Sequence, residues 1–117
     1  MESLPERLRA SLRTAIASRD HIAAAALRSA ISAIDNAQAV DHVVDRSGGR
    51  PVSKLGAGAS EVARRELSEH ELTEIVRREI EDRITASLEY ERRGRAAEAA
   101  TLRSEASVLS SQLDNPS

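Results

Sequence analysis

The chain has no cysteine, phenylalanine or tryptophan, and a single tyrosine among its 117 residues. Without cysteine it can form no disulfide and offers no thiolate for catalysis or metal binding. Without phenylalanine and tryptophan, its core must be built from leucine, isoleucine, valine and many alanines. Because an alanine side chain buries little apolar area, we expect a marginal stability.

Long apolar runs are also missing. No run approaches the length that spans a bilayer, and the first six residues lack the basic and apolar regions of a signal peptide. We therefore expect a cytoplasmic protein that does not bind a membrane.

Positive charge is unevenly distributed along the chain. The formal net charge is −2, but the first half carries an excess of arginine and the second half an excess of carboxylates. Between Arg7 and Ile34 the only acidic residue is Asp20, against the arginines Arg7, Arg9, Arg13, Arg19 and Arg28. This local excess of positive charge indicates an anionic partner.

The first helix is predicted to begin next to Ser3. Ser3 and Glu6 have the spacing of a capping box, in which each side chain accepts the backbone N–H of the other residue. Leu4, Leu8 and Leu12 then form an apolar stripe at helical spacing.

A sharp corner is predicted at Ser18–Asp20, because Asp20 is suited to cap a second helix. Apolar positions continue at helical spacing from Ala23 to Ala37, and the helix is expected to extend to about Asp45. Four of the five glycines then lie between Ser47 and Ala59. This composition predicts a flexible loop over residues 47–66, acting as a hinge between two helical halves.

The third helix has the clearest start signal in the sequence. Ser68 and Glu71 form a second capping box, while Leu67 and Leu72 occupy the two positions of a hydrophobic staple. The helix is expected to end near Gly94, because glycine favours the left-handed conformation that terminates helices. Its apolar face consists of Leu72, Ile75, Val76, Ile80, Ile84 and Leu88.

A fourth helix carries apolar residues three and four positions apart, which predicts a packing seam against the third helix in an α-hairpin. The seam consists of Ala99, Leu102, Ala106, Leu109 and Leu113. Together these patterns predict an all-α, multihelical fold of two small subdomains. An N-terminal helical pair spans residues 1–46, the Gly-rich loop spans 47–66, and a bundle based on the hairpin spans 67–117.

Catalytic and metal-binding constellations are not found in the sequence. His21, His42 and His70 are far apart, His70 is expected to lie exposed in a first turn, and a closed metal site needs about four ligands. Gly56–Ser60 lacks the Gly-Lys-Ser/Thr ending of a phosphate-binding loop, and no nucleophile stands beside a base. We therefore predict no catalytic residue, no metal and no cofactor, and we do not expect the chain by itself to be an enzyme.

The arginines fall into two groups. In the third helix four arginines each follow a glutamate by four residues, an arrangement that stabilises an exposed helix by a few tenths of a kcal/mol per pair. These pairs are Glu74–Arg78, Glu79–Arg83, Glu89–Arg93 and Glu91–Arg95. The second group has no carboxylate four residues upstream: Arg9, Arg13, Arg19 and Arg28. Two explanations stay open for this group, namely contact with an anion, and carboxylates that folding supplies from the third helix.

Tyr90 also has two interpretations. Burial against the alanine-rich hairpin is the more ordinary one. In the other, an exposed ring beside Arg92 and Arg93 stacks on a nucleic-acid base.

Four short strings of this sequence occur in an order and at a spacing that are typical of a known protein family. They are Leu27-Arg28, Leu67-Ser68-x-x-Glu71-Leu72, Tyr90-x-x-x-Gly94-Arg95 and Glu105-x-x-Val108-Leu109. In this order the chain resembles the GatB/YqeY family. The resemblance implies a multihelical fold similar to the tail domain of the tRNA-dependent amidotransferase B subunit. That tail helps to hold the tRNA, while the catalytic domain, which is absent here, performs the chemistry.

Three hypotheses follow. In the first, the protein is a GatB/YqeY-like accessory module that contacts tRNA or another structured RNA through phosphates, with Arg9, Arg13, Arg19 and Arg28 as the main candidates and Arg95 as a lesser one. In the second, it is a helical interaction module whose apolar seams bind a protein partner or a second copy. In the third, it is a non-catalytic subunit linked to a carbon–nitrogen ligase that uses glutamine as amide donor.

Overall fold

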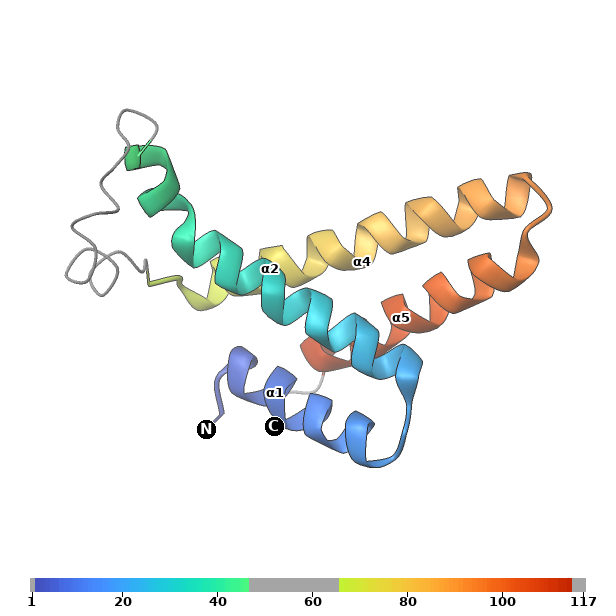
Figure 1. The fold of residues 1–117 in the computed structure, drawn as a ribbon, viewed down its shortest axis with the longest axis horizontal. Coiled ribbons are helices and arrows are strands. Elements are labelled where there is room, and N and C mark those ends of the chain that lie inside the picture. The colour runs from blue at the N-terminus through green and yellow to red at the C-terminus, as the bar shows by residue number, and fades with distance from the viewer. Residues whose placement is uncertain (1, 47–65, 115–117) are drawn as a thin grey trace.

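The computed structural model describes residues 2–46 and 66–114, and these form helices and short connections (Figure 1). The helices are α1 (Leu4–Ala17), α2 (His21–Arg46), α4 (Glu69–Arg92) and α5 (Ala96–Asp114). The prediction of an all-α fold is confirmed for this part of the chain, in which no strand occurs. The predicted 47–66 loop lies, except for its last residue, outside the described residues.

The start of α1 is fixed by the predicted capping box. The backbone N–H of Glu6 donates to Ser3 Oγ at 3.3 Å, and the backbone N–H of Ser3 donates to Glu6 Oε1 at 2.9 Å. Pro5 lies in the first turn, where its missing N–H has no intrahelical partner in any case. This prediction is confirmed.

The corner between α1 and α2 lies where the sequence predicts it. Arg19 adopts a positive φ of 62°, and its N–H donates to the carbonyl of Ile16 at 3.1 Å while that of Asp20 donates to the carbonyl of Ala15 at 2.9 Å. These two bonds form a Schellman motif, with Arg19 in the place that glycine usually takes. Asp20 then caps α2, because its Oδ1 accepts the N–H of Ala23 at 3.0 Å.

The ends of α4 also follow the prediction. The backbone N–H of Glu71 donates to Ser68 Oγ at 3.0 Å, and that of Ser68 donates to Glu71 Oε1 at 2.8 Å. At the other end Gly94 has a φ of 76°. The N–H of Arg95 donates to the carbonyl of Tyr90 at 2.9 Å, which completes a second Schellman motif.

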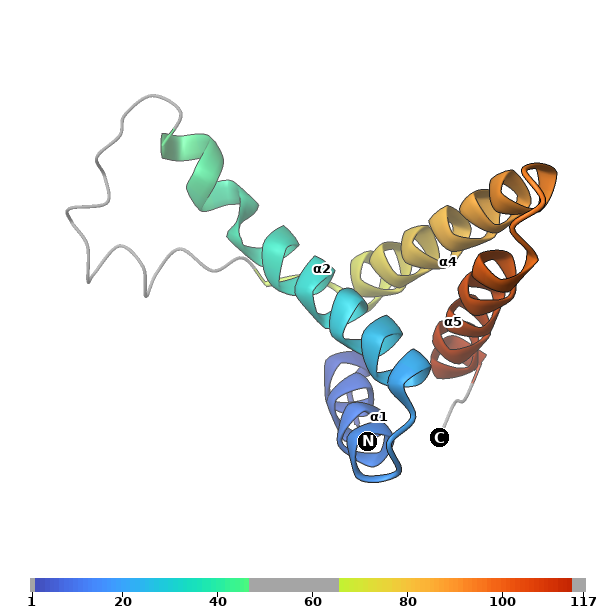
Figure 2. The same ribbon diagram turned by 45° about the vertical axis from the view of Figure 1, so that its right-hand side comes forward.

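One cluster of buried side chains joins all four helices. It includes Leu8 of α1, Leu27 of α2, Val76 of α4 and Leu109 of α5, each exposed by 1% or less. Figures 1 and 2 show α1 beneath α2, and α2 crossing the α4–α5 hairpin. Because the two helical pairs share this cluster, the predicted division into two subdomains is not confirmed.

The apolar stripe of α4 is covered over only part of its length. Leu72 and Val76 are buried in the shared core, as predicted. Further along α4, the side chains of Ile84 and Leu88 are 46% and 50% exposed. The second half of the stripe is left uncovered because α2 crosses the hairpin at the end where α4 begins (Figure 1).

The α5 seam is largely as expected. Ala99, Ala106 and Leu109 are buried, and Leu102 and Leu113 are partly buried. Among the described residues, no helix combines the length and the apolar character that crossing a bilayer requires.

Candidate nucleic-acid interface

Four of the five candidate arginines lie on the α1–α2 pair. Arg9 and Arg13 are one turn apart on α1, and Arg9 Nη2 lies 4.0 Å from Asp35 Oδ1 on α2. Arg28 is two turns before Asp35 and therefore lies on the same side of α2. Helical register thus aligns Arg9, Arg13 and Arg28 along one side of the pair, with Arg19 at its corner; we call these four residues the arginine face.

The corner end of this face contains a small pocket of about 150 Å³. Arg19 and Arg28 both line it, together with Asp20, His21 and the apolar side chains of Ala15, Ile16 and Ala24. The structure therefore places two candidate arginines, nine positions apart in the sequence, at one pocket.

Two carboxylates of the described residues lie beside the arginine face: Asp35 next to Arg9, and Asp20 in the corner pocket with Arg19 and Arg28. Arg13, Arg19 and Arg28 are exposed and form no ion pair within the described residues. The ion pair Arg9–Asp35, which the described residues form on this face, is about half exposed at both ends and lies at the limit of contact. Exposed pairs of this kind contribute at most about 1 kcal/mol, so Arg9 remains available to another anion.

Arg7 belongs to the same basic segment but has a structural role. Its Nη2 donates to the carbonyl of Gln112 at 3.1 Å, near the C-terminus of α5. A cation is favourable there because the last carbonyls of a helix have no intrahelical donor and carry partial negative charge. Ser11 Oγ donates to Gln112 Oε1 at 3.2 Å, so α1 holds this end of α5 at two points.

Arg95 is not brought to the arginine face. It lies at the turn between α4 and α5, which stands apart from α1 in both views (Figures 1 and 2). Its Nη2 donates to Glu98 Oε2 at 2.7 Å. This hydrogen bond, with the attraction between the two charges, raises the pKa of Arg95 and lowers that of Glu98.

Tyr90 lies beneath Arg95. The guanidinium carbon of Arg95 is 5.9 Å from the centre of the ring, within range of a cation–π contact. The tyrosine is half-buried and lines a pocket with Ala97 and Leu102 of α5. Its position against the hairpin agrees with the more ordinary of the two interpretations.

Two of the predicted pairs along α4 are present. Arg83 Nη1 lies 2.9 Å from Glu79 Oε1, and Arg93 Nη2 lies 3.7 Å from Glu89 Oε2. Arg92 shares Glu89, and its hydrogen bond and charge hold the pKa of that carboxyl below its ordinary value.

The other two predicted pairs are wrong. Glu74 pairs with Arg77 at 3.4 Å instead of Arg78. Glu91 pairs with Arg103 of α5 at 2.9 Å instead of Arg95. Both glutamates have a closer arginine in the fold, one three residues away and one on the neighbouring helix.

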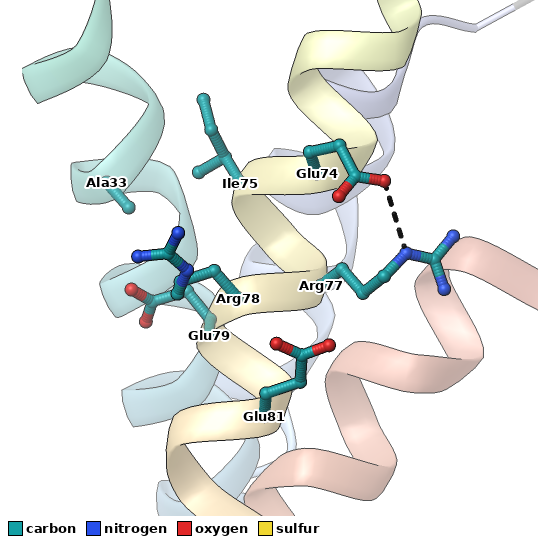
Figure 3. A pocket seen from close by; sticks show the side chains of 7 residues that line it. All are labelled: Ala33, Glu74, Ile75, Arg77, Arg78, Glu79 and Glu81. Carbon is teal, nitrogen blue, oxygen red and sulfur yellow. Dashed lines mark ion pairs between the residues drawn. The ribbon is translucent and has the colours of Figure 1, made fainter.

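Arg78, which the sequence predicted to pair with Glu74, is an exposed arginine. It forms no ion pair among the described residues and lines a pocket of about 420 Å³ between α2 and α4. Figure 3 shows Arg78 on the side of α4 towards Ala33, and Arg77 on the other side, next to Glu74. Glu79 and Glu81 also line this pocket, so its charge is mixed.

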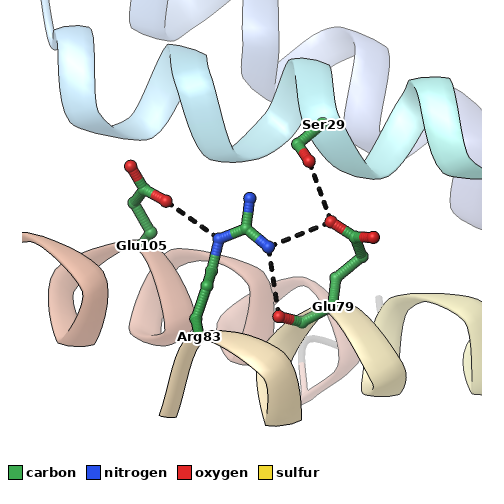
Figure 4. A network of polar contacts seen from close by, with 4 residues as sticks. All are labelled: Ser29, Glu79, Arg83 and Glu105. Atoms are coloured by element: carbon green, nitrogen blue, oxygen red, sulfur yellow. Dashed lines mark hydrogen bonds and ion pairs between the residues drawn. The ribbon is translucent and has the colours of Figure 1, made fainter. Parts of the chain in front are cut away.

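Arg83 is the centre of a partly buried polar network that joins three helices (Figure 4). Its Nε donates to Glu105 Oε1 at 2.9 Å, and Ser29 Oγ donates to Glu79 Oε1 at 2.8 Å. The side chain of Arg83 is only 14% exposed. Its expected place on a solvated face is therefore wrong, and its role is to hold α4 against α5 and α2.

Among the described residues, no group of three or more histidine, cysteine or acidic side chains is placed to hold a metal ion. His70 lies exposed in the first turn of α4, as expected.

Comparison with family models, with curated proteins and with solved structures finds no match to this chain. The resemblance to the GatB/YqeY family therefore rests on the short strings of the sequence.

Proposed function

We propose that the chain is a GatB/YqeY-like accessory protein that contacts tRNA or another structured RNA. The observation that carries the proposal is the arginine face, in which Arg13, Arg19 and Arg28 form no ion pair within the described residues. Guanidinium groups bind phosphate oxygens through paired, charge-assisted hydrogen bonds. Neutralising phosphates releases their counterions, which supplies most of the free energy of binding at low salt.

The extent of the face favours a polymer over a small anion. Ten residues separate Arg9 from Arg19, which corresponds to about 15 Å along a helix. A row of cations of this length can follow the backbone of a nucleic acid, whereas one phosphate can contact only part of it. The arginine side chains would recognise the shape and the phosphate backbone of the RNA rather than its base sequence.

Fluorescence anisotropy of labelled total tRNA at low and moderate salt tests the proposal. We expect saturable binding that weakens with added salt. The double variant Arg13→Glu/Arg28→Glu removes two phosphate contacts, so we expect the slope of log affinity against log salt to fall by about 2.

The double variant Arg78→Glu/Arg93→Glu is the matched control, since it makes the same change of net charge on α4. If both double variants weaken binding equally, the attraction is general and the arginine face is not the site. Absence of binding by the unaltered protein at low salt would overturn the proposed function altogether.

A role as a subunit linked to a carbon–nitrogen ligase rests on the family resemblance alone. No contact among the described residues favours it.

A further inference from the structure

We propose that the uncovered part of the α4 stripe binds a second copy of this chain, with the two α4 helices antiparallel. This inference is independent of the arginine face, which lies on the other helical pair. It starts from a groove of about 780 Å³ between α4 and α5. The groove is lined by Ile80, Ile84 and Leu88 of α4 and by Ala106, Ser107 and Ser110 of α5.

The shape of the groove suits a helix. Large apolar side chains project from α4, while the facing side of α5 carries alanine and serines between Arg103 and Asp114. The small size of the alanine and serines lets another backbone approach closely. Ile84 and Leu88 are each about half exposed. Two exposed neighbours of this size on one stripe mark an interaction surface better than scattered single residues do.

The charged residues beside the stripe indicate that the groove binds a second copy of this chain. Glu81 and Arg92 are about three turns apart, so they lie on the same flank of α4, next to Ile84 and Leu88. Glu81 is exposed and forms no ion pair within the described residues. Arg92 and Arg93 share the single carboxylate of Glu89, which leaves an excess of positive charge.

These charges are complementary to those of a second copy in one orientation. A two-fold axis perpendicular to α4 brings the same flank of both helices together. The point midway between Ile84 and Leu88 coincides, within one residue, with the point midway between Glu81 and Arg92. A two-fold axis that crosses α4 at the level of residue 86 therefore places Ile84 against Leu88 of the partner. In the same register, it places Glu81 against Arg92 of the partner.

The charged residues at the two ends of this interface are also compatible with the antiparallel orientation. The same register places Arg77 towards Arg95 of the partner, but each already has its own carboxylate. Arg77 pairs with Glu74 at 3.4 Å and Arg95 with Glu98 at 2.7 Å. Because the interface consists of one groove and one helix face, we expect a dissociation constant in the micromolar range.

Sedimentation equilibrium of the full chain from about 5 µM to about 0.5 mM spans this range. We expect the mass to rise towards that of a dimer. Leu88→Glu should weaken association at least about tenfold, because it buries a charge in the apolar centre of the interface. Ile16→Glu is the matched control, since Ile16 of α1 is 51% exposed, like Leu88, and it should leave association unchanged.

A charge exchange tests the orientation. Glu81→Arg and Arg92→Glu should each weaken self-association, because each places like charges in contact. Mixing these two variants should restore a dimer, since every contact then joins opposite charges. Asp82→Arg, on the side of α4 that faces away from the stripe, should have no effect. Circular dichroism of each variant verifies that it is folded.

Three results would overturn the inference. The first is a mass that stays monomeric up to the highest concentration. The second is a dimer that neither Leu88→Glu nor Glu81→Arg weakens, which would place the contact elsewhere. The third is a mixture of the two charge variants that does not associate, which would exclude the antiparallel register.

Discussion

The arginines of the α1–α2 pair and those of the α4–α5 hairpin differ in the carboxylates that surround them. In the hairpin, Arg83, Arg95 and Arg103 each have a carboxylate within 2.9 Å. In the pair, Arg13 and Arg28 form no ion pair among the described residues. The role of an arginine is thus decided by the acidic residues that the fold places beside it, and these gather on the hairpin.

Both sides contain exceptions to this contrast, such as Arg9, which forms an ion pair with Asp35. Arg7 belongs to the pair but donates to the carbonyl of Gln112 on α5. Arg78 belongs to the hairpin but forms no ion pair within the described residues. Position in the chain alone therefore does not separate structural arginines from available ones, and the contacts must be known.

The comparison assumes that the two pairs fold as one unit, and Leu109→Ala tests this. Leu109 of α5 is fully buried in the cluster that joins all four helices. Removing its side chain should lower the free energy of unfolding by about 3 kcal/mol, through lost burial and a cavity. Urea unfolding followed by circular dichroism should still show one transition. Two separate transitions would mean that the pair and the hairpin are independent.

Arg83→Ala should lower the free energy of unfolding, because Arg83 is a structural arginine of the hairpin. It leaves the carboxylates of Glu79 and Glu105, both largely buried, without their cation. Removing one partner of a buried ion pair costs about 3 kcal/mol, and partial exposure of the network reduces this to about 2 kcal/mol.

The control for Arg83→Ala is Arg93→Ala, which removes an ion pair that is largely exposed. Its effect on the free energy of unfolding should be below about 0.5 kcal/mol. Equal losses in the two variants would show that the network adds nothing to an ordinary surface pair.

Arg19→Gly should separate stability from binding. The left-handed conformation of Arg19, with a φ of 62°, costs a residue with a side chain about 1 kcal/mol, a cost that glycine avoids. We expect thermal unfolding at a higher temperature and, at the same time, a weaker affinity for tRNA in the anisotropy assay. An unchanged affinity would remove Arg19 from the arginine face.

The smallest of the expected effects is a change in the pKa of Glu98, at the tip of the hairpin. Arg95→Gln removes the hydrogen bond and the charge that lower the pKa of Glu98, so this pKa should rise towards its ordinary value. A lowered carboxyl pKa stabilises the fold above the ordinary pKa, and the contribution is lost as the pH falls through the lowered value. An NMR titration of the Glu98 carboxyl should show the rise, while Glu89 keeps its lowered pKa as an internal control.

Features that depend on neighbouring residues in the chain could be predicted from the sequence. The capping boxes at Ser3 and Ser68, the cap at Asp20 and the stop at Gly94 all involve residues within a few positions of one another. Such contacts form wherever the helix forms, so the residue pattern suffices to place them.

Features that depend on the crossing of helices could not be predicted. Helical periodicity identifies Ile84 and Leu88 as one stripe with Val76, but it does not tell which part of the stripe α2 covers. Likewise, nothing local indicates that Glu105 contacts Arg83, or that Glu91 contacts Arg103. The candidate residues were predicted one by one, yet the alignment of four of them into one face follows from the packing of α1 on α2. The separation of Arg95 from that face follows from its position at the turn between α4 and α5.

The lone aromatic side chain has a practical consequence. Tyr90 lies half-buried at the turn of the hairpin, beneath the guanidinium of Arg95, and the chain has no tryptophan. Its ultraviolet emission therefore originates from one known place, whereas circular dichroism averages over every helix. A difference between the melting curves from the two signals would measure how early the hairpin frays at its tip, without any added label.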